Sequence, residues 1–103
     1  MTARRFVILV GDIASADQDK LSAWLKTTSH GWWHHIPYSW LVHTYDTSLT
    51  AAELRNAVRA VLPTADVLVL SIESSSNWAA FGRPSMTAWL NDSWSKESPG
   101  AKT

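Results

Sequence analysis

Two short runs of the chain are apolar at every position, residues 6–10 (FVILV) and 67–70 (VLVL). Their β-branched and aliphatic side chains predict strands that are covered on both faces. Two further groups of strand-forming residues, 32–36 and 39–45, flank Pro37. Because proline fixes φ and cannot donate to a ladder, these two groups predict a hairpin with a short loop at Pro37.

Helical periodicity alternates with these strands. The letters SADQ have the spacing of a capping box, with Ser15 as the N-cap and Gln18 reaching back, and the helix that follows has Gly31 as its predicted left-handed stop. The letters TAAE, residues 50–53, form a second capping box, and Pro63 closes the helix after it. In each helix the core-facing residues recur at helical spacing. They are Leu21, Trp24, Leu25 and Thr28 in the first helix, and Leu54, Ala57, Val58, Val61 and Leu62 in the second. A short last helix aligns Met86, Trp89, Leu90 and Ser93 in the same way.

The last helix begins near Pro84 or Ser85, so the elements follow one another as β-α-β-β-α-β and a short helix. This order predicts a ferredoxin-like α+β domain with an antiparallel sheet, in which the first and third strands are central. We expect a single domain over residues 1–94 and a flexible polar tail over residues 95–103.

Two helices cover one face of such a sheet and leave the other face open. The runs 6–10 and 67–70 carry apolar side chains toward that open face, and soluble monomers seldom tolerate an apolar patch of this kind. The last helix, with Trp89 and Leu90, is one candidate cover, and a second copy of the chain is another. We therefore predict a symmetric homodimer.

Composition restricts the classes of partner. The formal net charge is zero, and the only basic clusters are Arg4 with Arg5 and Arg55 with Arg59. Nucleic acid is therefore a disfavoured partner, because binding usually depends on a basic excess. The chain contains no cysteine, which excludes disulfides and thiolate zinc sites. It has no stretch that resembles a signal peptide and no apolar run long enough to cross a membrane, so we expect a soluble, cytoplasmic protein without a membrane partner.

Tryptophan and histidine are concentrated in residues 30–44. His34 and His35 are adjacent on a strand, so their side chains point to opposite faces and do not chelate one metal together. A loop of two or four residues pairs Trp32 with His43 across the hairpin. A loop of three residues pairs Trp33 with His43 instead. In neither register do two histidines face each other. We expect the tryptophans to serve core and interface packing.

Five residues are candidate ligand or interface positions. These are Trp32, His34, His35, His43 and Arg83. The histidines carry a charge that is pH-sensitive near neutrality. Arg83 precedes the last helix, whose N-terminus is an anion-binding candidate.

Asp12 is the candidate for metal chemistry. It follows the first strand and precedes a helix, a place from which a carboxylate can ligate magnesium. Two such carboxylates across a two-fold axis can share one ion and activate a water. The other interpretation is a loop aspartate that accepts backbone N–H bonds near the start of the helix.

Several stretches together resemble the SinR-type family of small proteins. They are FVILVGDI, GWWHHIPYSWLVHT, AAELRNAVRAVLPTADVLVLSI, and NWAAFG followed by AWL, and they extend over residues 5–91. That family is similar, more distantly, to the CRISPR-associated spacer-integration protein and to VapD-type ribonuclease toxins, which are ferredoxin-like dimers. The resemblance implies a divalent metal held by Asp12 of both subunits. This chain differs from the CRISPR-associated pattern by Gly11 in place of a tyrosine and by the absence of the arginines that follow the aspartate.

Two functional hypotheses follow. In the first, the protein is a non-enzymatic, dimeric interaction or binding module, which requires no cofactor. In the second, it is a nuclease or nucleic-acid-handling protein that depends on magnesium or manganese, with Asp12 from each subunit as the catalytic and metal-binding residue.

Overall fold

The structure is a computed structural model, and it describes residues 3–73, 78–94 and 96. Its elements are β1 (Arg4–Val10), α1 (Ser15–Lys26), β2 (Gly31–Ile36), β3 (Ser39–Thr44), α2 (Ala51–Val61), β4 (Val67–Ile72), α3 (Pro84–Trp89) and η1 (Leu90–Trp94). Their order is the predicted one, but the last helix continues from α3 into the π-helical η1, which was not predicted. Of the predicted tail at 95–103, only Lys96 is described, and the serines at 74–76 with Asn77 lie outside the described residues.

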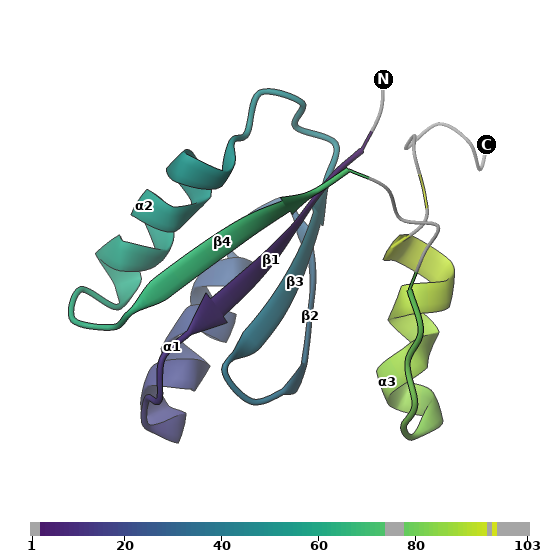
Figure 1. Ribbon diagram of the computed structural model, residues 1–103, viewed down its shortest axis with the longest axis horizontal. Helices are drawn as coiled ribbons and strands as arrows, with labels where there is room; N and C mark the ends of the chain where they lie inside the picture. Colours follow the sequence, from purple (N-terminus) through teal and green to yellow (C-terminus); the bar gives the residue numbers. More distant parts are fainter. Residues whose placement is uncertain (1–2, 74–77, 95, 97–103) are drawn as a thin grey trace.

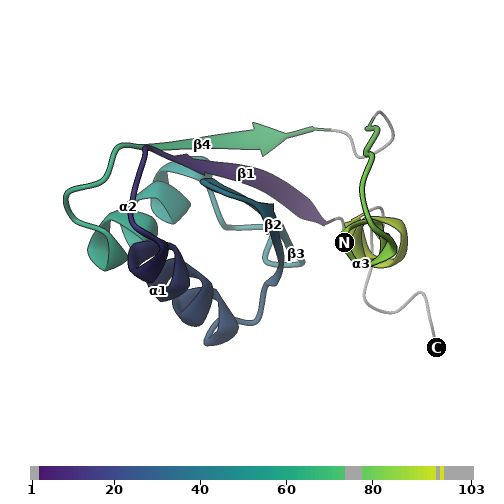
Figure 2. The ribbon, with the colours of Figure 1, turned by 90° about the horizontal axis from the view of Figure 1, so that it is seen from below.

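The four strands form one antiparallel sheet with the order β2-β3-β1-β4 (Figure 1). This order places the first and third strands in the centre and confirms the ferredoxin-like α+β class. Helices α1 and α2 lie together against one face of the sheet, whereas α3 stands at one end of it (Figure 2). The opposite face carries no helix along most of its length, and we call it the open face.

The main core lies between the sheet and helices α1 and α2. Alternate residues of β1 point into it, because successive side chains of a strand face opposite sides. Phe6 and Ile8 are fully buried there, and Trp40 of β3 is the largest side chain with no exposed surface. The core residues are Phe6, Ile8, Val10, Leu21, Leu25, Trp40, Val42, Leu54, Val58 and Leu62.

Of the two predicted capping boxes, only the second forms. The Thr50 hydroxyl accepts from the Glu53 backbone N–H at 3.1 Å, and the Glu53 carboxylate accepts from the Thr50 backbone N–H at 3.0 Å. The prediction for Ser15 was wrong, because α1 begins at Ser15 itself and its N-cap is Ala14, which has no capping side chain. Inside the first turn, a serine hydroxyl no longer has the N-cap geometry that reaches a free backbone N–H.

The predicted left-handed stop at Gly31 was also wrong. Gly31 is the first residue of β2, and no glycine in the described ranges has a positive φ. Helix α1 ends instead with two threonine side chains. The hydroxyl groups of Thr27 and Thr28 each donate at 2.7 Å to the carbonyls of Trp24 and Leu25. These bonds satisfy carbonyl groups of the last turn, so no glycine is needed there.

The β2–β3 hairpin has a two-residue loop and a bulge. At the loop, Ile36 pairs with Ser39, but between Trp33 and Ile36 the register shifts by one residue. Beyond the bulge, the pairs are Trp33 with Leu41, Trp32 with Val42 and Gly31 with His43. Neither predicted register therefore extends along the hairpin, although the prediction that no two histidines face each other is confirmed.

Candidate functional site

The open face of the sheet is apolar on three strands. Strand pairing sets Val7 of β1 between Leu41 of β3 and Leu70 of β4, and sets Leu9 beside Leu68. Ile72 continues the same row on β4. The predicted two-sided apolar character of these strands therefore has a structural counterpart, and it raises the question of what covers this face.

Helix α3 and η1 cover one end of the open face. Trp33, Leu90 and Trp94 form a second buried cluster, with Leu41, Ile72, Met86 and Trp89 packed around it. The Trp33 indole N–H donates to the Met86 carbonyl at 2.7 Å, which fastens α3 to β2. The last helix thus supplies part of the predicted cover.

Two side chains of the sheet hold the end of η1, and we call them the Arg5–His43 clamp. Arg5 is only 2% exposed, and its guanidinium donates to the Trp94 carbonyl and, at 3.1 Å, to the Lys96 carbonyl. The His43 Nε2 atom lies 2.7 Å from that Lys96 carbonyl oxygen, so Nε2–H is the donor. A cationic group at the C-terminal end of a helix also has a favourable interaction with the helix dipole.

The clamp changes the interpretation of two sequence features. His43, a candidate ligand or interface residue, is 4% exposed and helps to anchor the C-terminal helix. The Arg4–Arg5 cluster does not form a basic surface, because Arg5 is buried and the Arg4 side chain donates to the Thr47 carbonyl at 2.7 Å.

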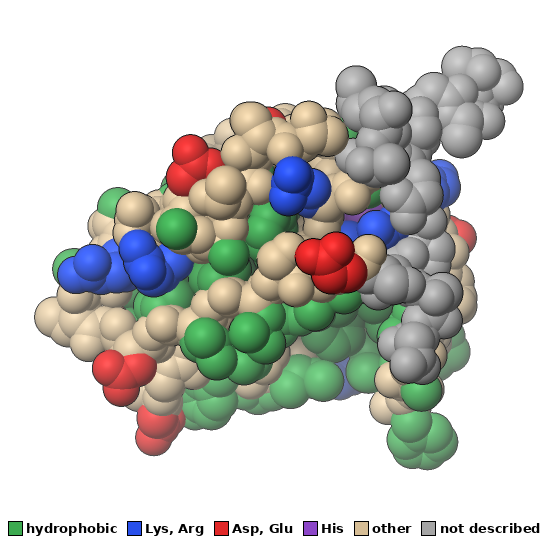
Figure 3. All heavy atoms as spheres, turned by 45° about the horizontal axis from the view of Figure 1, so that its top comes forward, with side chains coloured by type: hydrophobic (Ala, Val, Ile, Leu, Met, Phe, Trp, Pro, Cys, Tyr) green, Lys and Arg blue, Asp and Glu red, His purple; other side chains and the backbone are tan. Residues whose placement is uncertain are grey.

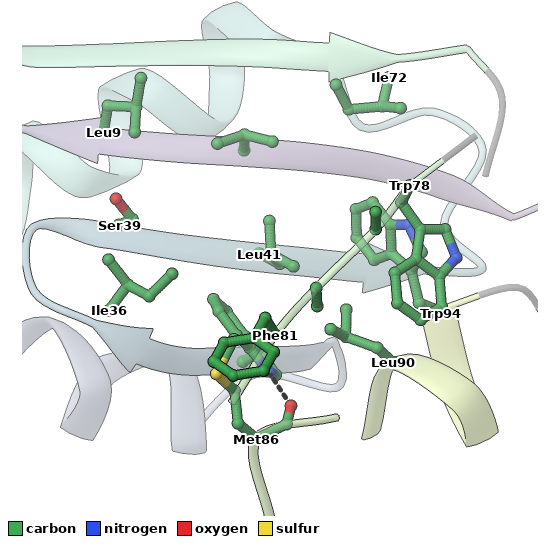
Figure 4. A pocket seen from close by; sticks show the side chains of 14 residues that line it. Leu9, Ile36, Ser39, Leu41, Ile72, Trp78, Phe81, Met86, Leu90 and Trp94 are labelled. Carbon is green, nitrogen blue, oxygen red and sulfur yellow. Dashed lines mark hydrogen bonds between the residues drawn. The ribbon is translucent and has the colours of Figure 1, made fainter. Parts of the chain in front are cut away.

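A groove of about 510 Å³ lies beside the part of the open face that α3 covers. Residues 78–83, which we call the crossing segment, pass over the sheet at this place, as Figure 4 shows for the stretch between Trp78 and Phe81. The described residues that line the groove include no charged side chain, and Ser39 carries the only hydroxyl group among them. The lining residues are Val7, Leu9, Trp33, Ile36, Ser39, Leu41, Ile72, Trp78, Ala79, Ala80, Phe81, Met86, Leu90 and Trp94.

Large apolar side chains remain exposed around the groove. The exposed fractions are 53% for Leu68, 44% for Leu70 and 47% for Ile36, and Phe81 of the crossing segment is 99% exposed. In the space-filling view, hydrophobic side chains gather along the sheet toward the end where α3 lies (Figure 3). The helix therefore covers only part of the apolar face, and the remainder is a candidate binding surface.

The other predicted residues of the hairpin are separated from this surface or lie at its margin. Trp32 is half-buried against the main core. His34 stacks on Trp40 with ring centroids 4.0 Å apart, whereas His35 lies 5.3 Å from Trp33. Because Trp40 and Trp33 belong to the two different clusters, His34 and His35 lie on opposite faces, as predicted.

The structure does not bring the candidate metal and anion ligands together. In the ranges that the structure describes, no group of three or more histidine, aspartate or glutamate side chains is placed to hold a metal. Arg83 is exposed at the start of α3, which has only six residues and thus offers little of a helix dipole to an anion.

Asp12 has a partner that sequence reasoning missed. It lies exposed after β1, and a hydrogen bond to its carboxylate, together with its negative charge, raises the pKa of the Tyr38 hydroxyl above its ordinary value. Tyr38 has φ 66°, a left-handed conformation that is rare outside glycine, asparagine and aspartate. Its carbonyl also accepts from the Val10 N–H at 3.0 Å. The hairpin loop is therefore tied to the end of β1 through both its backbone and its side chain.

Within the described ranges, none of the helices combines the length and apolarity that crossing a membrane requires. Comparison of the chain with protein-family models, with curated proteins and with solved structures found no match.

Proposed function

We propose that the chain is a non-enzymatic interaction module that binds a second copy of itself through the open face of its sheet. The observation that carries this proposal is the uncharged groove of about 510 Å³, bordered by the exposed side chains of Leu68, Leu70 and Ile36. Homodimer interfaces are more apolar than other protein surfaces, and they lack charges in their centre. A groove whose described lining carries no charged side chain meets that description, because it can pair with its own copy without like-charge repulsion.

The exposed area suits an interface of ordinary size. A large apolar side chain offers roughly 200 Å² of surface, so the five exposed ones around the groove present on the order of 500 Å². Their exposed fractions range from 37% for Trp78 to 99% for Phe81. A standard interface takes about 800 Å² from each partner, somewhat under two-thirds of it apolar. The open face therefore supplies about the apolar area that one side of a stable dimer requires.

Leu70→Lys tests this proposal. Leu70 lies in the middle of β4 and is 44% exposed, so a lysine there keeps its ammonium group in water in a single chain. In a dimer, the same ammonium would be buried between two apolar faces. We expect the wild-type chain to sediment as a dimer at micromolar concentrations and the dissociation constant of Leu70→Lys to rise at least about tenfold.

Ala60→Lys is the matched control, because Ala60 is exposed on α2, away from the open face. It should dimerise like the wild type. Circular dichroism of both variants verifies that the fold is intact. A wild-type chain that sediments as a monomer at high micromolar concentration, or equal dissociation constants for all three proteins, would contradict the proposal.

A second candidate function is a nuclease that depends on magnesium or manganese and acts through Asp12 of both subunits. The observation that favours it is that Tyr38, a residue with a left-handed backbone (φ 66°), has its hydroxyl hydrogen-bonded to the Asp12 carboxylate. Backbone strain of this kind is frequent at functional sites. If this function holds, the protein cleaves RNA or DNA in the presence of either metal, and Asp12→Ala removes the cleavage. Cleavage that survives Asp12→Ala, or that does not depend on metal, excludes this mechanism.

A further inference from the structure

Phe81 is the most exposed large apolar residue that the structure describes. Its side chain is 99% exposed, although it lies at the rim of the apolar groove (Figure 4). A phenylalanine in this state buries almost none of its ring in its own chain, so the ring leaves its own groove open. An exposed aromatic side chain next to an apolar groove indicates a binding surface rather than a folding requirement.

The crossing segment holds Phe81 in place from the C-terminal side. The backbone at Gly82 lies against the Met86 side chain, so the segment packs closely on α3 at this point, and a Cβ there would require the flexible end of Met86 to move. The Met86 N–H donates to the Arg83 carbonyl at 2.9 Å, and the Met86 carbonyl accepts from Trp33. These contacts connect the residues after Phe81 to β2, so the ring is presented outward from an anchored segment.

The groove is suited to receive an aromatic ring. Its strands contribute Leu9, Leu41 and Ile36, and Trp33 and Trp94 stand at the end that α3 covers. Phenylalanine packs well on aliphatic side chains and forms tilted or edge contacts with indole rings. Since no charged residue lines the groove in the part of the chain that the structure describes, an entering ring does not desolvate a charge there.

We propose that Phe81 of each chain inserts into the groove of a second chain, in a reciprocal, two-fold arrangement. This inference rests on the proposed self-association and names the residue that one copy contributes to the groove of the other. In a two-fold interface, the same patch meets itself, so a protrusion and a cavity that lie side by side on one face are filled together. The apolar area around the groove, on the order of 500 Å², is sufficient for this interface.

The absence of cysteine in the chain permits a direct test by crosslinking. Phe81→Cys and Ser39→Cys are prepared as separate single-cysteine chains, one of them lengthened by a tag, mixed, and treated with a short bis-maleimide. The reagent spans the space that the Phe81 ring would otherwise fill between position 81 of one chain and Ser39 on the floor of the other chain's groove. We expect the mixed crosslink between the two different chains to be the main product.

Ser15→Cys is the matched control, because Ser15 is exposed at the start of α1, on the helix side of the sheet. Mixed with Phe81→Cys, it should give little crosslink. A main product that joins two Phe81→Cys chains would place Phe81 on the two-fold axis and overturn the inference. Equal crosslinking of Ser39→Cys and Ser15→Cys would overturn it as well.

Phe81→Ala provides the second measurement. Because a ring that is 99% exposed contributes little to the fold of a single chain, this variant should fold like the wild type. We expect its dissociation constant to rise by about 10- to 100-fold, as for a central interface residue. If the wild type dimerises and Phe81→Ala dimerises equally well, this inference fails and the proposed function stands. If the wild type does not dimerise, both fail.

Discussion

Replacing Trp40 by alanine should lower the free energy of unfolding by about 3–5 kcal/mol. Trp40 is fully buried in the main core, its indole N–H donates to the Ser22 hydroxyl at 3.1 Å, and the His34 ring stacks on it with centroids 4.0 Å apart. The substitution leaves a cavity, and it removes the indole ring that Ser22 and His34 both contact. Because small domains are stable by about 5–15 kcal/mol in total, the urea concentration at the midpoint of unfolding should fall markedly.

Trp78→Ala is the control for this prediction, since it removes the same side chain from a site that is 37% exposed. We expect a loss of about 1 kcal/mol or less there, because surface substitutions have small effects. Equal losses for the two variants would mean that Trp40 does not have the central position in the core that its burial indicates.

Arg5→Met should have the next largest effect, a loss of about 2–3 kcal/mol of unfolding free energy, as for hydrogen bonds to charged groups. Methionine preserves much of the apolar stem and removes the donors that hold the carbonyls of Trp94 and Lys96. The loss should be concentrated at the C-terminal end. Hydrogen exchange of the backbone amides in η1 should accelerate more than exchange in β1, whose ladder bonds do not depend on the Arg5 side chain.

Arg4→Met is the matched substitution, because Arg4 is the neighbouring residue of the same strand and is exposed. Its side chain donates to the Thr47 carbonyl, and its loss should change the stability by about 0.5 kcal/mol or less. If Arg4→Met and Arg5→Met have the same effect, the clamp does not contribute to stability.

Local patterns were sufficient to predict the elements and their order. Helix α2 illustrates why: its capping box, apolar stripe and closing Pro63 all lie within a short stretch, and each acts through neighbours in the sequence. The open face also followed from local information, because the apolar runs at 6–10 and 67–70 have too many apolar positions for a sheet with one solvated face. The structure then showed that α3 covers only one end of this face.

Features that depend on distant partners were not predictable in this way. The bulge between Trp33 and Ile36 has no signature in composition, and it alone changed the partner of His43 to Gly31. Arg5 belongs to a basic pair in the sequence, but its partners are the carbonyls of Trp94 and Lys96, about 90 residues away in the chain. The role proposed for Phe81 depends on an exposed fraction that no periodicity reveals.

The Arg5–His43 clamp has a consequence for biosynthesis. Residue 5 leaves the ribosome well before residues 94 and 96, to which the carbonyl groups that it holds belong. Until those residues have emerged, the Arg5 guanidinium of the nascent chain remains in water, whereas in the folded chain it is buried. The central strand β1 also waits for β3 and β4, since both of its ladders join it to later segments. The sheet and its C-terminal cover are therefore expected to be completed only after residue 96 has emerged, because these contacts have a high sequence separation.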